Sequence, residues 1–385
     1  MRGLQVVTGR SKASRRRWLS HDSNSENSNR RQFLTGRALR DRLQSATEAL
    51  GDQLAPTAVE APTGGSTLRL TTRAMACDFS VIVNPDAAQQ LKHGSDALDL
   101  LHPLEQLMTV YRDDSEMTRV NTQASDHDTA VDRGLYSLLR RAQELSIATD
   151  GGFDPTSGPL IQLWRSCRAD GRLPTQGEIE AALLRTGIDQ VRFDDQACSI
   201  GFDRPGMELN LGAIGKGHAL DHISSHLLDQ GLANFLCHGG QSSIRAQGTH
   251  HGLPGWPIGI KNPLFTEQRL GTVLLQDQAM GTSGSNIQYF RLEGRRFGHI
   301  LDPRSGWPVQ DMLSCWVFAP TAEMADALST AFFVIGVENA RKYCDNHEGI
   351  SAILIPQPRQ GRSLEPVICG VPEEALFLTS VDVTT

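Results

Sequence analysis

The chain has 385 residues, 39% of them hydrophobic, so it is long enough and apolar enough to bury a sizeable core. Its net charge of −7 argues against nucleic-acid binding and against a membrane-surface role, because either role would need a basic face. No stretch approaches the ~20 consecutive apolar residues of a membrane span. The seven cysteines stand singly, which favours reduced, buried cysteines in a globular protein.

Residues 1–63 are rich in Arg, Ser, Asn and Gln and show no sustained apolar periodicity, which predicts a disordered or loosely attached tail. Within them, Arg30-Arg31 looks like a twin-arginine export motif, but charged residues follow where an apolar segment would be needed. We therefore expect the protein to be cytoplasmic. We expect residues 64–385 to form the folded domain.

The first predicted element is a hairpin that begins near Thr67, where apolar residues alternate on both sides of Met75. Helical spacing then predicts, in order, a core-facing helix over 87–108, an exit loop over 109–121 and a helix over 135–148. The turn-rich run 151–156 comes next. It either presents its backbone and the Asp154 carboxylate to a ligand or simply ends the preceding helix.

The stretch 207–221 combines alternating Leu209 and Leu211 with a glycine run, which predicts a strand that leads into a helix. Such a junction is a natural anion site, because the first helical N–H groups are unpaired and Lys216 adds a positive charge. Three glycines would let a ligand approach the backbone: Gly212, Gly215 and Gly217. Plain loop geometry is the alternative, since the spacing fits no familiar nucleotide motif.

Two apolar runs that end in polar turns, 235–237 and 258–260, predict neighbouring strands in a large sheet. A further strand leads to His299 and Asp302, which are close enough in sequence to face one pocket across the Pro303 turn. A histidine with a purely structural role is the alternative.

Thr321 is the predicted N-cap of a helix over 322–333. Asp326 and Thr330 are four residues apart on this helix, so they lie on one face, and both offer oxygen ligands. Two oxygens form at most part of an Mg²⁺ site, because that ion prefers six ligands and usually takes the rest from water and phosphate. An ordinary solvated helix face is the alternative.

Together these motifs resemble the ApbE family of FAD:protein FMN transferases, in the family's order over roughly residues 68 to 355. The matching segments are Met75, 108–111, Ser115-Glu116, Asn121, 151–164, 208–221, Gly239-Gly240, Trp256, 282–284, 299–306 and 325–331. The resemblance implies an α+β fold of mostly antiparallel sheets flanked by helices, with FAD held between two lobes. It also implies Mg²⁺-dependent transfer of FMN from FAD to a Ser or Thr hydroxyl of a target protein, with release of AMP.

The resemblance also implies a set of site residues. Flavin contacts would fall on Met75, Tyr111, Gly152, Phe153, Asp154, Glu208, Lys216 and Ile300. Metal ligands would be the carbonyl of Ala213 and the side chains of Asp326 and Thr330. His299, held by Asp302, would help deprotonate the attacking hydroxyl or stabilise charge on the pyrophosphate.

The chain departs from the family pattern at three places. Met75-Ala76-Cys77 stands where the family usually has Met-Gly-Thr, which alters the packing beside the flavin. Ser285-Asn286 follows Thr-Ser-Gly where an acidic residue is common, and Gln241 replaces the usual Asp after Gly-Gly. The last two changes remove carboxylates near the expected chemistry. The alternatives are therefore an FAD pyrophosphatase that yields FMN and AMP, or a non-catalytic FAD-binding protein.

Overall fold

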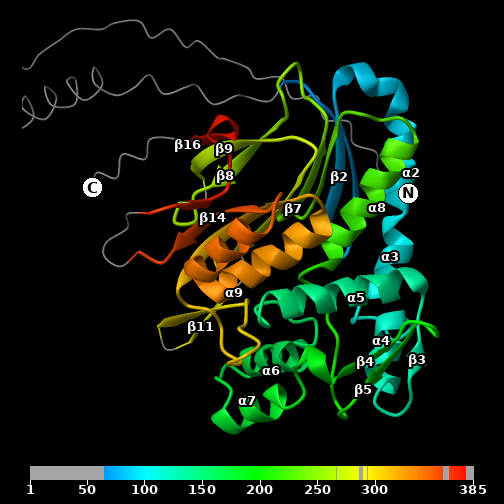
Figure 1. Cartoon of the computed structure of the whole chain (residues 1–385), viewed down its shortest axis with the longest axis vertical. Helices are drawn as coiled ribbons and strands as arrows, with labels where there is room; N and C mark the ends of the chain where they lie inside the picture. Colours follow the sequence, from blue (N-terminus) through cyan, green and yellow to red (C-terminus); the bar gives the residue numbers. More distant parts are fainter. Residues whose placement is uncertain (1–64, 266, 286–288, 293, 359–363, 379–385) are drawn as a thin grey trace, which may run out of the picture. The chain divides into compact units, whose positions relative to one another are not determined.

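The computed structural model describes residues 65–378, apart from 266, 286–288, 293 and 359–363. The predicted tail over 1–63 and the Arg30-Arg31 pair lie outside these described residues. Every pair of named strands is antiparallel and helices flank the sheets, which confirms the expected α+β class (Figure 1). In the part of the chain that the structure describes, no helix is long and apolar enough to cross a membrane.

The body is built on an eight-stranded sheet with the strand order β1-β2-β6-β7-β10-β13-β14-β15. In that order, its strands are Leu68–Ala74, Cys77–Val83, Phe235–Gly239, Ser243–Gln247, Ala279–Gly284, Met312–Ala319, Ser351–Pro356 and Val367–Cys369. One smaller sheet has the order β16-β9-β8, with strands Leu376–Leu378, Arg269–Leu275 and Trp256–Lys261. Another has the order β3-β5-β4, with strands Thr129–Ala130, Ser199–Phe202 and Val191–Asp194. The strands β11 (Tyr289–Leu292) and β12 (Arg295–Gly298) form a separate hairpin.

The α-helices lie between and after these strands along the chain. They are α2 Leu91–Asp99, α3 Leu101–Met108, α4 Glu116–Gln123, α5 Arg133–Ala148, α6 Gly158–Ala169, α7 Gln176–Leu183, α8 Gly215–Asp229 and α9 Ala322–Asn346. Short 3₁₀ turns cover Pro85–Gln90, Ile188–Gln190 and Glu373–Ala375. Figure 1 shows α8 and α9 side by side against the large sheet, and the two helices are in contact.

The large sheet has an apolar core on each face, and β10 shows how one strand serves both. Successive side chains of a strand point to opposite faces. Ala279 belongs to the core shared with α8 and α9, whereas Met280 belongs to the core shared with Trp256 and Ile258 of β8. The alternation therefore turns Gly281 and Ser283 toward α9, which positions the Thr-Ser-Gly motif beside that helix.

The first hairpin is confirmed, with Ala74 paired with Cys77 around the turn. The helix predicted over 87–108 breaks at Leu100 into α2 and α3. The loop predicted over 109–121 is wrong in its second half, because α4 begins at Glu116. Sequence spacing missed this short helix, whose N-terminus is capped by the Ser115 hydroxyl accepting from the Thr118 amide.

Two strand predictions need correction. Residues around Leu209 form no named strand, and Glu208 makes only an isolated bridge with Ser157, although α8 begins in the glycine run as expected. The runs at 235–237 and 258–260 lie in different sheets, as parts of β6 and β8. Periodicity identifies a strand locally, whereas its partners depend on contacts far away in the sequence.

Candidate functional site

Asp326 is the most buried of the predicted polar site residues. Only 5% of its surface is exposed, so the alternative of a solvated helix face is wrong at this position. Its Oδ2 atom accepts hydrogen bonds from the Gly217 amide and from the Ser243 hydroxyl, both at 2.8 Å. Lys216 Nζ lies 4.0 Å from the same oxygen. The second turn of α9 therefore supplies a buried carboxylate to the first turn of α8.

Burial raises the pKa of Asp326 to about 6, although Lys216 and the two hydrogen bonds oppose that shift. A charged carboxylate is costly to bury, so a cation that approaches it lowers the free energy of the charged form. Among the described residues, no group of three or more His, Cys, Asp and Glu side chains could hold a metal ion. A metal site here would consequently combine this one carboxylate with neutral oxygens.

The glycine run at the start of α8 allows close helix packing, whereas the sequence predicts that it makes room for a ligand. A Cβ atom at Gly217 would lie 2.0 Å from the Ala322 carbonyl oxygen, so this glycine makes room for α9 and not for a ligand. Its amide, one of the unpaired donors of the helix N-terminus, binds Asp326. In a regular helix that amide would bond to the Ala213 carbonyl. The anion at this amide is thus the protein's own carboxylate, and the Ala213 carbonyl is spared that bond.

Thr330 lies one turn beyond Asp326 on α9 and is half-buried. The Ser283 hydroxyl of β10 lies 3.3 Å from the Thr330 hydroxyl and 3.0 Å from that of Ser329. Neither Ser243 nor Ser283 was singled out from the sequence as a site residue. The sequence feature that could have identified Ser283 is the alternation of side chains along β10, which turns Ser283 toward α9.

The loop of Gly152, Phe153 and Asp154 contacts the next part of α9. A Cβ atom at Gly152 would lie 2.3 Å from Ile335 Cγ2. Phe153 is only 2% exposed and belongs to the main core. The Asp154 carboxylate accepts from the amide and hydroxyl of Thr156 at 2.8 and 2.6 Å. Asp154 therefore shapes its own loop, and any flavin contact is an additional role.

Met75 occupies the turn between β1 and β2 with a left-handed φ of 50°, and its amide donates to Glu105 Oε1 at 2.9 Å. The neighbouring Cys77 packs on the β6–β7 turn, where a Cβ atom at Gly240 would lie 3.2 Å from its sulfur. Burial raises the pKa of the Cys77 thiol, and the charge of Lys216 opposes this shift. The Met75 turn accordingly packs beside the β6–β7 turn through Cys77.

Glu208 and Tyr111 both adjoin α6. Gln162 of α6 donates a hydrogen bond to the Glu208 carboxylate, and burial raises the pKa of Glu208. Tyr111 is 70% exposed, and the guanidinium of Arg165 lies 5.1 Å from its ring centroid. Within the described residues, neither side chain forms a hydrogen bond or an ion pair with Asp326 or Lys216.

His299 directly follows β12, as predicted, and its side chain is exposed. Ile300 is buried in the main core. Both oxygens of Asp302 bind the guanidinium of Arg304, at 2.8 and 2.9 Å, so this carboxylate is engaged by a residue that sequence reasoning missed. The pairing of Asp302 with His299 stays a prediction.

Arg304 also connects this segment to the Gly152 loop. Its Cγ atom lies 3.7 Å from where a Cβ atom of Gly151 would be. Gly152 itself contacts α9 one turn beyond Thr330. The structure thus brings the Gly152 loop beside α9, and it brings the segment 299–306 beside that loop. Asn286 lies outside the described residues.

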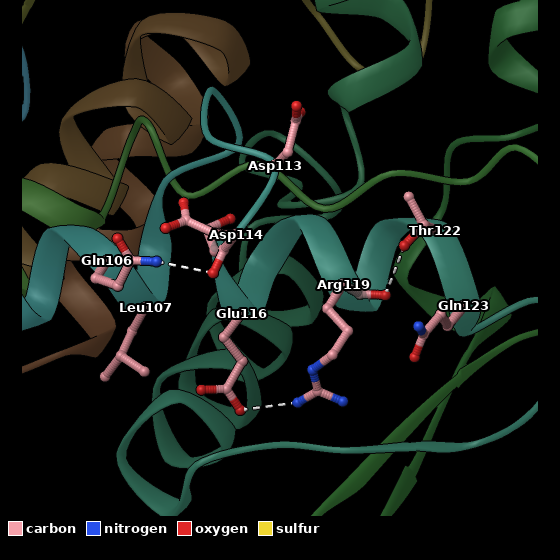
Figure 2. A pocket seen from close by; sticks show the side chains of 9 residues that line it. Gln106, Leu107, Asp113, Asp114, Glu116, Arg119, Thr122 and Gln123 are labelled. Carbon is pink, nitrogen blue, oxygen red and sulfur yellow. Dashed lines mark hydrogen bonds and ion pairs between the residues drawn. The ribbon is translucent and has the colours of Figure 1, made fainter.

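A cavity of about 560 Å³ lies elsewhere, between the end of α3 and α4 (Figure 2). Its lining residues are Gln106, Leu107, Asp113, Asp114, Ser115, Glu116, Arg119, Thr122 and Gln123. Several of them already bind each other: Gln106 donates to the Asp114 carbonyl, and Arg119 pairs with Glu116. Within the described lining there is no predicted site residue, so this cavity is not the predicted site.

Comparison with known proteins gives one consistent result. Residues 75–354 match the sequence profile of the ApbE family. The chain is 34% identical over 267 residues to a Klebsiella pneumoniae protein named FAD:protein FMN transferase, a match that covers 69% of this chain and 82% of the relative. The fold is similar to that of the ApbE protein of Thermotoga maritima (TM-score 0.71, 28% identity) and of the flavin transferase ApbE of Vibrio cholerae (0.70, 27%). Each structural match covers 79% of this chain and 97% of the other. By sequence and by fold, the chain belongs to the ApbE family.

Proposed function

We propose that this chain is an FAD:protein FMN transferase that, with Mg²⁺, moves FMN from FAD onto a Ser or Thr hydroxyl of an acceptor protein and releases AMP. The observation that carries the proposal is the buried Asp326 carboxylate, 4.0 Å from Lys216 and near Thr330 on the same helix face. Membership in the ApbE family supports the flavin chemistry, because a relative from Klebsiella pneumoniae is named for that transfer.

The residues present fit a Mg²⁺ ion. Asp326 would supply a carboxylate, Thr330 a hydroxyl and Ala213 a carbonyl, all of them the hard oxygen ligands that this ion prefers. The Ala213 carbonyl suits the role because the Gly217 amide binds Asp326 instead of completing a helical bond to it. Mg²⁺ bound there would neutralise negative charge on the pyrophosphate of FAD.

The chain's own residues would then guide the transfer. The hydroxyl oxygen of the acceptor bonds to the phosphorus of the FMN half, the bridging P–O bond breaks, and AMP leaves with the electron pair. Lys216, whose side chain is 25% exposed beside Asp326, would attract the pyrophosphate. An imidazole nitrogen of His299 would take the hydroxyl proton, or protonated His299 would stabilise the phosphate charge.

An FAD pyrophosphatase is the second candidate, in which water replaces the acceptor hydroxyl. It is favoured by Gln241, which offers an amide where a carboxylate is usual and whose Oε1 accepts from Lys261 at 3.1 Å. A site with fewer carboxylates has fewer groups to select or deprotonate a protein hydroxyl.

Mass spectrometry of candidate acceptor proteins, combined with chromatography of the nucleotides, tests both functions. The protein is incubated with FAD, with Mg²⁺ or EDTA, and with each acceptor. Covalent FMN on the acceptor together with AMP supports the transferase. Free FMN and AMP with unmodified acceptors would indicate the pyrophosphatase, and bound but intact FAD would refute both. Asp326→Asn serves as the control that should lose Mg²⁺-dependent turnover.

A further inference from the structure

The N-termini of α8 and α9 are joined by an exchange of carboxylates. Asp221, in the second turn of α8, accepts from the first two amides of α9: Oδ1 from Ala322 at 2.8 Å and Oδ2 from Glu323 at 2.9 Å. Asp326, in the second turn of α9, accepts from the Gly217 amide near the start of α8 at 2.8 Å. Each helix therefore satisfies unpaired N-terminal donors of the other, where a negative charge also complements the helix dipole.

The exchange occurs where the two helix backbones approach each other closely. At Gly217, a Cβ atom would lie 2.0 Å from the Ala322 carbonyl oxygen. On the sheet side, a Cβ atom at Gly281 would lie 2.1 Å from the carbonyl oxygen of Ala325. The first turn of α9 is thus held between α8 and β10 by two glycines. These contacts determine how closely the first turn of α9 packs against α8 and β10. The hydrogen bonds of Asp221 also restrain the position of α9 along its axis.

A second ionic contact joins the same helices. Glu323 is 6% exposed, lies 2.8 Å from His218 Nδ1 of α8 and is bonded by Arg141 of α5. These partners lower the pKa of Glu323 although its burial acts to raise it. Within the described residues, the Asp221 carboxylate accepts hydrogen bonds from backbone amides only, those of Ala322 and Glu323. Asp221 therefore acts on the position of the helix itself.

We infer that Asp221 is a positioning residue for the metal-binding end of the site: it holds the start of α9 against α8 so that Asp326 lies beside Lys216 and the Gly217 amide. The inference rests on the proposed function, since it assigns Asp221 a role in preparing the Mg²⁺ ligands. The Asp221 carboxylate binds the backbone amides of Ala322 and Glu323 in α9 and not the proposed ligand oxygens.

The test compares Asp221→Asn with Thr321→Ala, a matched control at the same helix end. Thr321 is the local N-cap of α9, and its hydroxyl accepts from the Met324 amide without any tie to α8. Loss of either cap should lower the melting temperature in EDTA by a few degrees, roughly 2–4 °C per lost cap. Asp221→Asn is nearly isosteric, so it is preferred over Asp221→Ala, which removes both acceptors and endangers folding.

The deciding measurement is the Mg²⁺ concentration that gives half of the melting-temperature increase in the presence of FAD. Removal of an outer support of a metal ligand typically weakens metal affinity by ~10–100-fold, which is the change expected for Asp221→Asn. Thr321→Ala should change this Mg²⁺ concentration by less than about twofold, because its cap acts within α9 alone. FAD binding in EDTA, followed by flavin fluorescence, should be nearly unchanged in both variants.

The outcomes distinguish a failure of the proposed metal site from a failure of the role inferred for Asp221. If wild-type protein shows no Mg²⁺ response with FAD, the proposed metal site is wrong and the role of Asp221 falls with it. If wild type responds and both variants keep its Mg²⁺ dependence, Asp221 is merely a helix cap and only the inference is refuted. Equal weakening in both variants would also overturn it, because general fraying of α9 would then explain the effect.

Discussion

Replacement of Asp326 by Asn should leave the stability of the metal-free protein nearly unchanged at acid pH and raise it at neutral pH. The folded-state pKa of about 6 lies above the ordinary value of 3.8, so the native protein binds this proton more tightly than the unfolded chain does. The stability contribution of the group is therefore largest below pH 3.8. It falls as the pH rises to 6 and is constant above that. The difference of about two pKa units corresponds to ~3 kcal/mol in the metal-free protein.

Asn does not titrate, and its Oδ1, placed where Asp326 Oδ2 lies, can accept from both donors, Gly217 N and Ser243 Oγ. At pH 4 the wild-type carboxyl is itself neutral, so Asp326→Asn should be about as stable as wild type. At pH 8 the variant avoids the buried charge and should be more stable than wild type by up to ~3 kcal/mol in the metal-free protein.

Melting temperatures measured from pH 4 to 8, in EDTA and in Mg²⁺ with FAD, check both parts. Mg²⁺ at 100 times its dissociation constant should stabilise wild type by ~2.7 kcal/mol, and should do so above pH 6 more than below it, because the ion needs the charged carboxylate. A pH-independent difference in EDTA would show that Asp326 does not titrate near 6. Equal Mg²⁺ stabilisation of both proteins would remove Asp326 from the metal site.

Three other substitutions have distinct expected results. His299→Ala should lower turnover at saturating FAD by ~10²–10⁴-fold with little change in melting temperature; normal turnover per folded molecule would end its catalytic assignment. Thr330→Ala should weaken the Mg²⁺ response in the same direction as Asp326→Asn but less, because a neutral hydroxyl binds the ion less strongly than a carboxylate. Gly217→Ala should destabilise by ~3 kcal/mol or more, since its Cβ would meet the Ala322 carbonyl at 2.0 Å. The matched control Gly177→Ala has no atom within 4 Å and should be neutral or stabilising by up to ~1 kcal/mol in thermal unfolding; equal melting temperatures for the two would refute the close helix contact.

Local patterns were sufficient for much of this protein. Hydrophobic periodicity and capping signals predicted the hairpin around Met75, the start of α8 in the glycine run and the start of α9 after Thr321, and the structure confirms all three. The spacing of Asp326 and Thr330 also placed both on one face of a helix. These features depend on residues close together in sequence, where a 3.6-residue or two-residue period is direct evidence.

Only the tertiary structure decided what that helix face does. Gly217 and Asp326 are 109 positions apart, and no local sequence pattern predicts that the amide of one binds the carboxylate of the other. The same holds for the strands β6 and β8, which belong to different sheets. Burial and partner choice arise from packing between distant elements, and packing is what turned an ordinary i, i+4 pair into a shielded carboxylate beside Lys216.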